Sequence, residues 1–131
     1  MEVPARPAPP DTPLSRPYWE AARAGRFVVQ QCTGCARLRH YPRLVCAACF
    51  SVGVRWHAVS GRGRIHSWTV THHAFHPAFA AELPYALVTV DLEEGVRALG
   101  RWSGGDLAME QPVSGRFVQK DGQPELVFSP V

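Results

Sequence analysis

The sequence has no long apolar run, one lysine, and no cysteine outside the segment 32–49. A membrane-spanning helix needs about 18 consecutive apolar residues, so the sequence does not predict a membrane protein. The first residues, MEVPARPAPPDTP, also lack the apolar stretch of a secretory signal peptide. We therefore expect a cytoplasmic protein. In a reducing compartment, paired cysteines are typical of metal sites rather than disulfides.

Motifs for independent catalysis are missing as well. The sequence has no G-x-S-x-G motif, and neither Ser60 nor Ser67 has an evident base beside it. Asp91, Glu93 and Glu94 are typical of strand ends and turns rather than of an acid–base pair. The sequence therefore does not predict an enzyme that acts alone.

Charge is distributed unevenly along the chain. Residues 1–64 carry ten arginines against three acids, a net charge of +7, whereas residues 65–131 carry four basic residues against eight acids, a net charge of −4. A basic segment can bind the phosphates of nucleic acid or of a nucleotide cofactor. Thirteen of the fourteen basic residues are arginine, which genome base composition also explains, so both interpretations stay open.

Composition and proline content predict that the chain consists of an extended N-terminal arm followed by folded parts. Apolar residues make up 46% of it, enough for a folded core. Five of the twelve prolines fall within residues 1–13, which predicts a flexible, extended arm over 1–14. We expect an N-terminal helix and a metal-binding segment over 15–53, followed by a barrel domain over 54–131.

A short helix is predicted at 16–24. Pro17 suits its first turn, Ala21 and Ala22 favour helix, and Gly25 is a natural stop. A helix of two turns is marginal in water by itself, so Tyr18 and Trp19 must pack against something. The sequence leaves open whether they contact this chain or another subunit.

The rest of the chain is rich in short β-type runs. These runs alternate with glycine-containing turns, and no second helix is predicted among them. This pattern is typical of a small closed β-barrel. The fold class is therefore mainly β. The predicted strands are VRWHAVSG (54–61), RIHSWTVTH (64–72), YALVTVDL (85–92), VRALGRWS (96–103), PVSGRFVQ (112–119) and ELVFS (125–129).

The four cysteines form two C-x-x-C pairs separated by ten residues, Cys32 with Cys35 and Cys46 with Cys49. Each pair on a tight turn directs two sulfurs to one point, and two pairs complete the tetrahedral shell of Zn²⁺. Four thiolates leave no position for water or substrate, so we expect a structural zinc ion. Iron accepts the same ligands, and a redox dithiol is a third alternative.

A histidine-rich loop follows the second predicted barrel strand. His72 and His76 have a weak metal-ligand spacing, and His73 lies between them. No cysteine or carboxylate nearby completes a shell. We interpret the loop as a polar segment at the barrel mouth, with contact to a partner or to acyl-CoA as the alternative.

These motifs together resemble the DUF35 family, over about residues 17–130. The resemblance is carried by the order of the segments PYWEAARAGRFVVQQCTGC, YPR, CAAC, WHAVSGRGRIHSWTVTH, PYALVTVDLEEGVRALGRW and PVSGRFV. It implies a helix, a rubredoxin-like zinc ribbon and a five-stranded OB-fold barrel. One departure is Glu110, which stands near a place where the family commonly has glycine.

The resemblance also implies a function. DUF35 proteins associate with thiolase-fold enzymes, among them thiolases, acyltransferases and the retro-aldolases of steroid side-chain degradation, and some are fused to a MaoC-like hydratase. It implies a non-catalytic scaffold that helps to form an acyl-CoA channel. Arg37, Arg39 and Arg43 are candidates for CoA phosphates, and Tyr18, Trp19, His72, His73 and His76 are candidates for the partner interface.

A single-stranded nucleic-acid binder is the alternative function, because OB-fold barrels bind single strands through aromatic side chains and a basic groove. The net charge of −4 over residues 65–131 argues against it, since phosphate binding needs the opposite sign.

Overall fold

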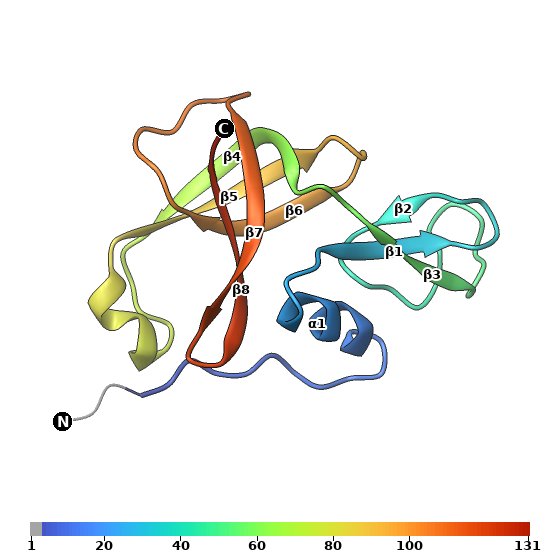
Figure 1. The fold of residues 1–131 in the computed structure, drawn as a ribbon, viewed down its shortest axis with the longest axis horizontal. Helices are drawn as coiled ribbons and strands as arrows, with labels where there is room; N and C mark the ends of the chain where they lie inside the picture. Colours follow the sequence, from blue (N-terminus) through green and yellow to red (C-terminus); the bar gives the residue numbers. More distant parts are fainter. Residues whose placement is uncertain (1–3) are drawn as a thin grey trace.

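The computed structural model describes residues 4–131, and residues 1–3 lie outside the described part. The chain forms a helix, a small three-stranded sheet and a closed barrel (Figure 1). None of the helices in residues 4–131 is long and apolar enough to cross a membrane.

The predicted N-terminal helix is present as α1 (Arg16–Arg23). It ends before Gly25, which has a φ of +78°, a conformation that glycine adopts without steric cost. Tyr18 is 5% exposed and belongs to the core of this chain. The helix contacts β1, β7 and β8, so it is supported by packing within the chain.

The cysteine segment lies in a small antiparallel sheet. Its strand order is β2 (Leu38–Arg39), β1 (Val28–Cys32), β3 (Val54–Ala58). The sequence predicts residues 54–58 as the start of the barrel domain, but β3 pairs with β1 along its whole length, from Val54 opposite Cys32 to Ala58 opposite Val28. This pairing brings the segment after the second cysteine pair back beside the first pair.

The barrel is closed by five strands in the order β4-β5-β6-β8-β7. All pairings are antiparallel except that between β6 and β8, which is parallel. A five-stranded Greek-key barrel is the OB-fold, so the predicted fold class is confirmed. The strands are β4 (Arg62–Thr71), β5 (Tyr85–Leu92), β6 (Arg97–Trp102), β7 (Pro112–Lys120) and β8 (Gln123–Pro130).

One short helix was not predicted. A 3₁₀ turn, η1 (Pro77–Glu82), lies in the connection between β4 and β5. It begins at a proline, whose fixed φ suits a first helical position. The connection is therefore more ordered than the polar loop expected there.

Phe128 lies at the centre of the barrel core and is fully buried. A Cβ atom added at Gly100 or Gly115 would come within 2.7 Å or 2.5 Å of its ring. Close approach also explains the two glycines of the segment SGRG (60–63). A Cβ atom at Gly61 or Gly63 would lie 2.3 Å from a backbone oxygen of the neighbouring strand. The absence of these side chains allows the strands and the Phe128 ring to approach closely.

Besides the packing of α1 on the barrel, polar contacts attach the ribbon and the N-terminal arm to the barrel. Tyr41, from the YPR segment, accepts a hydrogen bond at 3.0 Å through its hydroxyl oxygen from the backbone N–H of Leu99 on β6. The N-terminal arm runs beneath the β7–β8 hairpin on its way to α1 (Figure 1). Its Arg6 side chain is only 7% exposed and forms ion pairs with Glu82 and Glu125, so the arm, expected to be flexible, is held against the barrel.

Candidate metal centre and surrounding surface

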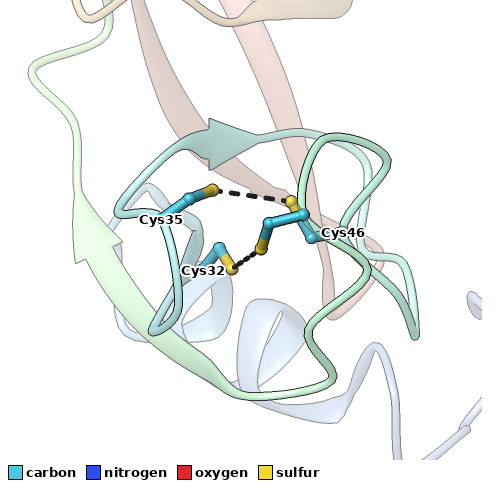
Figure 2. A group of neighbouring side chains, drawn as sticks. Cys32, Cys35 and Cys46 are labelled. Carbon is cyan, nitrogen blue, oxygen red and sulfur yellow. Dashed lines mark hydrogen bonds between the residues drawn. The ribbon is translucent and has the colours of Figure 1, made fainter.

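The four cysteines converge as the sequence predicts. Their sulfur atoms all lie within 4.8 Å of one another, and Figure 2 shows the three labelled cysteines directed toward a common point. The Sγ atoms of Cys32 and Cys49 are 3.5 Å apart, and those of Cys35 and Cys46 are 3.7 Å apart. A disulfide bond needs about 2.05 Å, so the cysteines are not bonded to one another.

These distances fit a metal ion. Four thiolates around Zn²⁺, each about 2.3 Å from the ion, lie about 3.8 Å from one another in a tetrahedron. Among residues 4–131 the four cysteines are the only group of three or more such side chains close enough to share an ion. The four cysteines are therefore placed to form a metal site.

Backbone N–H groups surround the sulfurs. The N–H of Gly34 donates to Cys32 Sγ at 3.3 Å, and the N–H of Ala48 donates to Cys46 Sγ at 3.4 Å. Hydrogen bonds from the backbone of Cys35 and then of Gly34 lower the pKa of Cys32 to about 6. Such bonds stabilise the thiolate form, which is the form that binds metal.

Two glycines shape the turns that carry the sulfurs. A Cβ atom at Gly53 would lie 2.0 Å from Thr33 Oγ1, and one at Gly34 would lie 3.0 Å from Cβ of Ser51 and 3.3 Å from Sγ of Cys49. A side chain at Gly53 would thus collide with Thr33, and one at Gly34 would press on Ser51 and Cys49. The first turn and the chain after the second pair therefore pass close to each other.

The three candidate arginines differ in their environments. Arg39 donates from Nε to the side-chain oxygen of Gln30 at 2.7 Å, and also donates to the carbonyl of Arg43 at 3.1 Å. Gln30 is 1% exposed, so Arg39 satisfies a buried polar group. Arg37 and Arg43 are exposed and line a shallow cavity of about 130 Å³ beside the second cysteine pair. Their side chains are available to an anion, whereas that of Arg39 is engaged.

The three histidines of the loop after β4 also differ in their environments. His72 and His73 are exposed. The Nδ1 atom of His76 accepts a hydrogen bond at 3.1 Å from the backbone N–H of Ala78 and caps η1. The structure therefore gives His76 a local role that the sequence spacing did not indicate.

Tyr18 and Trp19 pack edge to face, with ring centroids 4.9 Å apart. Tyr18 is buried against Phe117 and His40, so it is not available as a surface contact in this arrangement. Trp19 is half-buried and retains an exposed part.

An exposed apolar group on the cysteine turns was missed by sequence reasoning. Leu44, Phe50 and Val52 are 71%, 77% and 75% exposed. They lie in loops between the strands of the ribbon, so no hydrophobic period singles them out. The sequence did hold one signal for them. The cysteine sulfurs occupy the interior of this short segment, so its large apolar residues have little room to be buried. We refer to Leu44, Phe50 and Val52 as the knuckle patch.

Both parts of the fold match known family models. Residues 19–54 match the ChsH2 rubredoxin-like zinc ribbon domain, and residues 56–118 match the ChsH2 C-terminal OB-fold domain. The chain of a solved structure of the Ltp2-ChsH2(DUF35) aldolase is 32% identical, with a TM-score of 0.84, and the match covers 93% of this chain and 98% of that one. This chain belongs to the ChsH2 (DUF35) family.

Other relatives differ in length or are more distant. A probable enoyl-CoA hydratase alpha subunit of Thermomonospora curvata is 36% identical, covering 86% of this chain and 36% of the relative. A 3-oxo-4,17-pregnadiene-20-carboxyl-CoA hydratase alpha subunit of Mycobacterium tuberculosis is 31% identical, covering 77% and 32%. The chain therefore spans about a third of the length of these curated relatives. A DUF35 protein of unknown function from Sulfolobus solfataricus is 14% identical with a TM-score of 0.64, covering 91% and 86%, and shares the fold.

Proposed function

We propose that this chain is a non-catalytic accessory subunit of a thiolase-fold acyl-CoA enzyme. The observation that carries the proposal is the match at 32% identity to a ChsH2(DUF35) chain of an aldolase, which covers 98% of that chain. The family resemblance implies a thiolase, an acyltransferase or a retro-aldolase as the partner. Two hydratase alpha subunits among the relatives support association with a MaoC-like hydratase as well.

The metal site supports a structural role. We propose that Zn²⁺ is the ion, because it binds four thiolates without redox chemistry. The four cysteines would hold it, and a bound zinc ion would supply folding free energy to the loops of the ribbon. All four ligands come from the protein, so the site offers no open position to a substrate.

The knuckle patch supports a contact with another protein. Leu44, Phe50 and Val52 are large apolar side chains that stay exposed within one short segment, and exposed apolar surface is typical of interaction sites. Here they stand on turns that are fixed by the metal site, so their ordering costs little entropy on binding. We propose that Leu44, Phe50 and Val52 contact the thiolase-fold partner, with the exposed part of Trp19, His72 and His73 as further contacts.

Two exposed arginines beside the second cysteine pair support a role in an acyl-CoA channel. Arg37 and Arg43 are exposed beside the shallow cavity next to the second cysteine pair. Guanidinium groups bind phosphate in two-point contacts. We propose that these two arginines contact phosphates of CoA held by the partner, and that Arg39 positions this loop through Gln30.

Co-expression of the tagged chain with the thiolase-fold protein tests the accessory role. We expect the two to co-purify, the partner to lose activity without this chain, and this chain alone to show no turnover of acyl-CoA thioesters. Phe50→Ser should weaken the complex by about 2 kcal/mol if it is a hot spot, while Val131→Ser, at an exposed position outside the ribbon, serves as the control. Full activity of the partner without this chain would contradict the proposal.

The CoA contact is tested separately. Arg43→Ala should leave the complex intact but raise the partner's KM for its CoA thioester, and Arg26→Ala, at another exposed arginine, should not. An unchanged KM in the intact complex would remove the CoA contact and leave the scaffold role.

The nucleic-acid alternative receives less support from the structure. Arg6 and Arg101, the cations next to the aromatic residues Phe79 and Tyr85, are both paired with Glu82 and Glu125. Paired cations offer little net charge to phosphates. Salt-dependent binding of a single-stranded oligonucleotide would reverse this conclusion.

A further inference from the structure

A cleft of about 480 Å³ lies between the N-terminal arm, α1 and the barrel. Its walls are mainly apolar and aromatic, and its volume is within the range of sites for small molecules. It is distinct from the metal site and from the cavity beside Arg37. The large apolar and aromatic side chains of its lining include Trp19, Phe79, Tyr85, Leu99, Phe117 and Leu126.

The arm forms one wall of this cleft. Arg6, Pro7, Ala8 and Pro9 all line it. The backbone N–H of Arg6 donates to Asp121 in the β7–β8 hairpin at 3.3 Å. Pro7 and Pro9 have no N–H to donate, so side-chain contacts of Arg6 are the main polar attachment at this end of the arm.

Arg6 is attached at the junction of η1 and β8. Its guanidinium pairs with Glu82 at 2.5 Å and with Glu125, and lies 4.9 Å from the centre of the Phe79 ring. The arm thus closes over the cleft through contacts with residues 76 and 119 positions away in the sequence. Arg6→Ala would remove these side-chain contacts and leave the backbone contact with Asp121 and every residue of the barrel in place.

The charges at this end of the cleft balance. Arg101 pairs with Glu82 at 3.1 Å and lies over the Tyr85 ring at 3.9 Å. Two arginines and two glutamates therefore neutralise one another, and a charged ligand would have to break these pairs. An uncharged ligand does not face that cost.

One further polar group at the cleft, the side-chain amide of Gln123, has an oxygen without a hydrogen-bond partner among the described residues. Gln123 lines the cleft, and its side-chain oxygen is buried without a hydrogen-bond partner among residues 4–131. A buried amide without a partner costs free energy. This oxygen is therefore a candidate acceptor for a hydrogen-bond donor on a bound molecule.

We propose that this cleft is a binding site for an uncharged, ring-bearing apolar molecule that carries one hydrogen-bonding group, and that the arm closes over it through Arg6. Aromatic and aliphatic walls bind the rings, the balanced charges exclude ions, and Gln123 pairs with the polar group. The site belongs to this chain alone and does not depend on the accessory-subunit function.

N-phenyl-1-naphthylamine is a suitable probe, because it is neutral, has aromatic rings and one N–H group, and fluoresces strongly in apolar surroundings. We expect saturable binding to the full chain with a stoichiometry of one. Leu99→Arg places a charge at a 46% exposed position of the cleft and should weaken binding roughly tenfold or more. Val70→Arg, at a 50% exposed valine of β4 that does not line the cleft, is the control and should not.

The arm and the amide are tested with the same probe. Arg6→Ala should weaken binding several-fold, and Arg26→Ala should not. The wild type should prefer N-phenyl-1-naphthylamine to 1-phenylnaphthalene, which lacks the N–H group, and Gln123→Leu should lose this preference.

Binding that is absent, or that is equal in the wild type and Leu99→Arg, would overturn the site. Equal binding by Arg6→Ala and Arg26→Ala would overturn the role of the arm. Because the assay uses this chain alone, either result is independent of the test with the thiolase-fold partner.

Discussion

Arg39 donates its Nε–H to the side-chain oxygen of Gln30 at 2.7 Å, and Gln30 is almost completely buried. The same oxygen accepts the backbone N–H of Arg43 at 2.8 Å. This one amide therefore connects β1 to β2 and to the loop that leads into the second cysteine pair. An arginine that the sequence offered as a ligand contact is part of the ribbon's own hydrogen-bond network.

Arg39→Ala should therefore destabilise the protein, by about 1–3 kcal/mol, because a charged hydrogen bond to a buried group is lost. Arg37→Ala, at an exposed position two residues before Arg39, should change the free energy of unfolding by less than about 0.5 kcal/mol. Denaturant unfolding at constant metal concentration measures both. Equal effects of the two substitutions would contradict the assigned role of Arg39.

His40 predicts a pH dependence of stability. Both of its ring nitrogens are buried without partners among the described residues, and it packs between Tyr18, Phe27 and Tyr41. Burial lowers the pKa of His40 from 6.5 to about 4. The unfolded chain therefore binds this proton at a higher pH than the folded chain does.

The contribution of His40 is fully present above pH 6.5 and is lost as the pH falls from 6.5 toward 4, by about 3 kcal/mol in all. His40→Phe should reduce this pH dependence while keeping the aromatic packing. Unfolding measured from pH 5 to pH 7.5, with metal content checked at each pH, makes the comparison. The same slope in both proteins would show that His40 is not the group responsible.

The metal site predicts one bound ion per chain and coupling between metal and folding. Cys35→Ala should lose the ion and unfold the ribbon, because the three remaining thiolates cannot complete the tetrahedral shell. Elemental analysis and circular dichroism before and after chelation provide the measurement. A wild-type chain that folds equally well without metal, or one whose cysteines form two disulfides by mass, would refute this prediction.

Glu110 adopts a φ of +64°, in the region where glycine is favoured. Its N–H donates to the carbonyl of Ile65 at 2.9 Å, and its carbonyl accepts from Arg64 at 3.1 Å. The turn that the family commonly builds with glycine is therefore present here with a glutamate.

Glu110→Gly should raise the thermal midpoint, with a gain of about 1 kcal/mol, because a left-handed conformation is costly for a residue with a side chain. Glu94→Gly should instead lower the midpoint, because Glu94 is not among the residues with a positive φ and its carboxylate accepts a hydrogen bond from the N–H of Ser60 at 2.8 Å. A lower midpoint for Glu110→Gly would show that the side chain itself stabilises the turn.

The metal site and the regular elements could be predicted from the sequence because their signals are local. The spacing within each C-x-x-C pair determines that two sulfurs meet, and the two pairs lie within 18 residues. The bounds of α1 follow from Pro17 and from Gly25 in the same way. The short β-type runs predicted a small closed barrel in general terms. The resemblance to the DUF35 family then specified a five-stranded OB-fold barrel.

Contacts between distant segments were decided by the tertiary structure. Nothing near Arg6 indicates that it pairs with Glu125, 119 residues away, and nothing near residues 54–58 shows that β3 pairs with β1 rather than with the barrel. Likewise, only packing distinguishes the engaged Arg39 from the exposed Arg37 and Arg43. The sequence by itself determined which residues can bind a metal and which segments form strands, because these depend on neighbours a few positions apart. The three-dimensional packing decided which side chains remain free for a partner or a ligand, because burial depends on elements brought together from the whole chain.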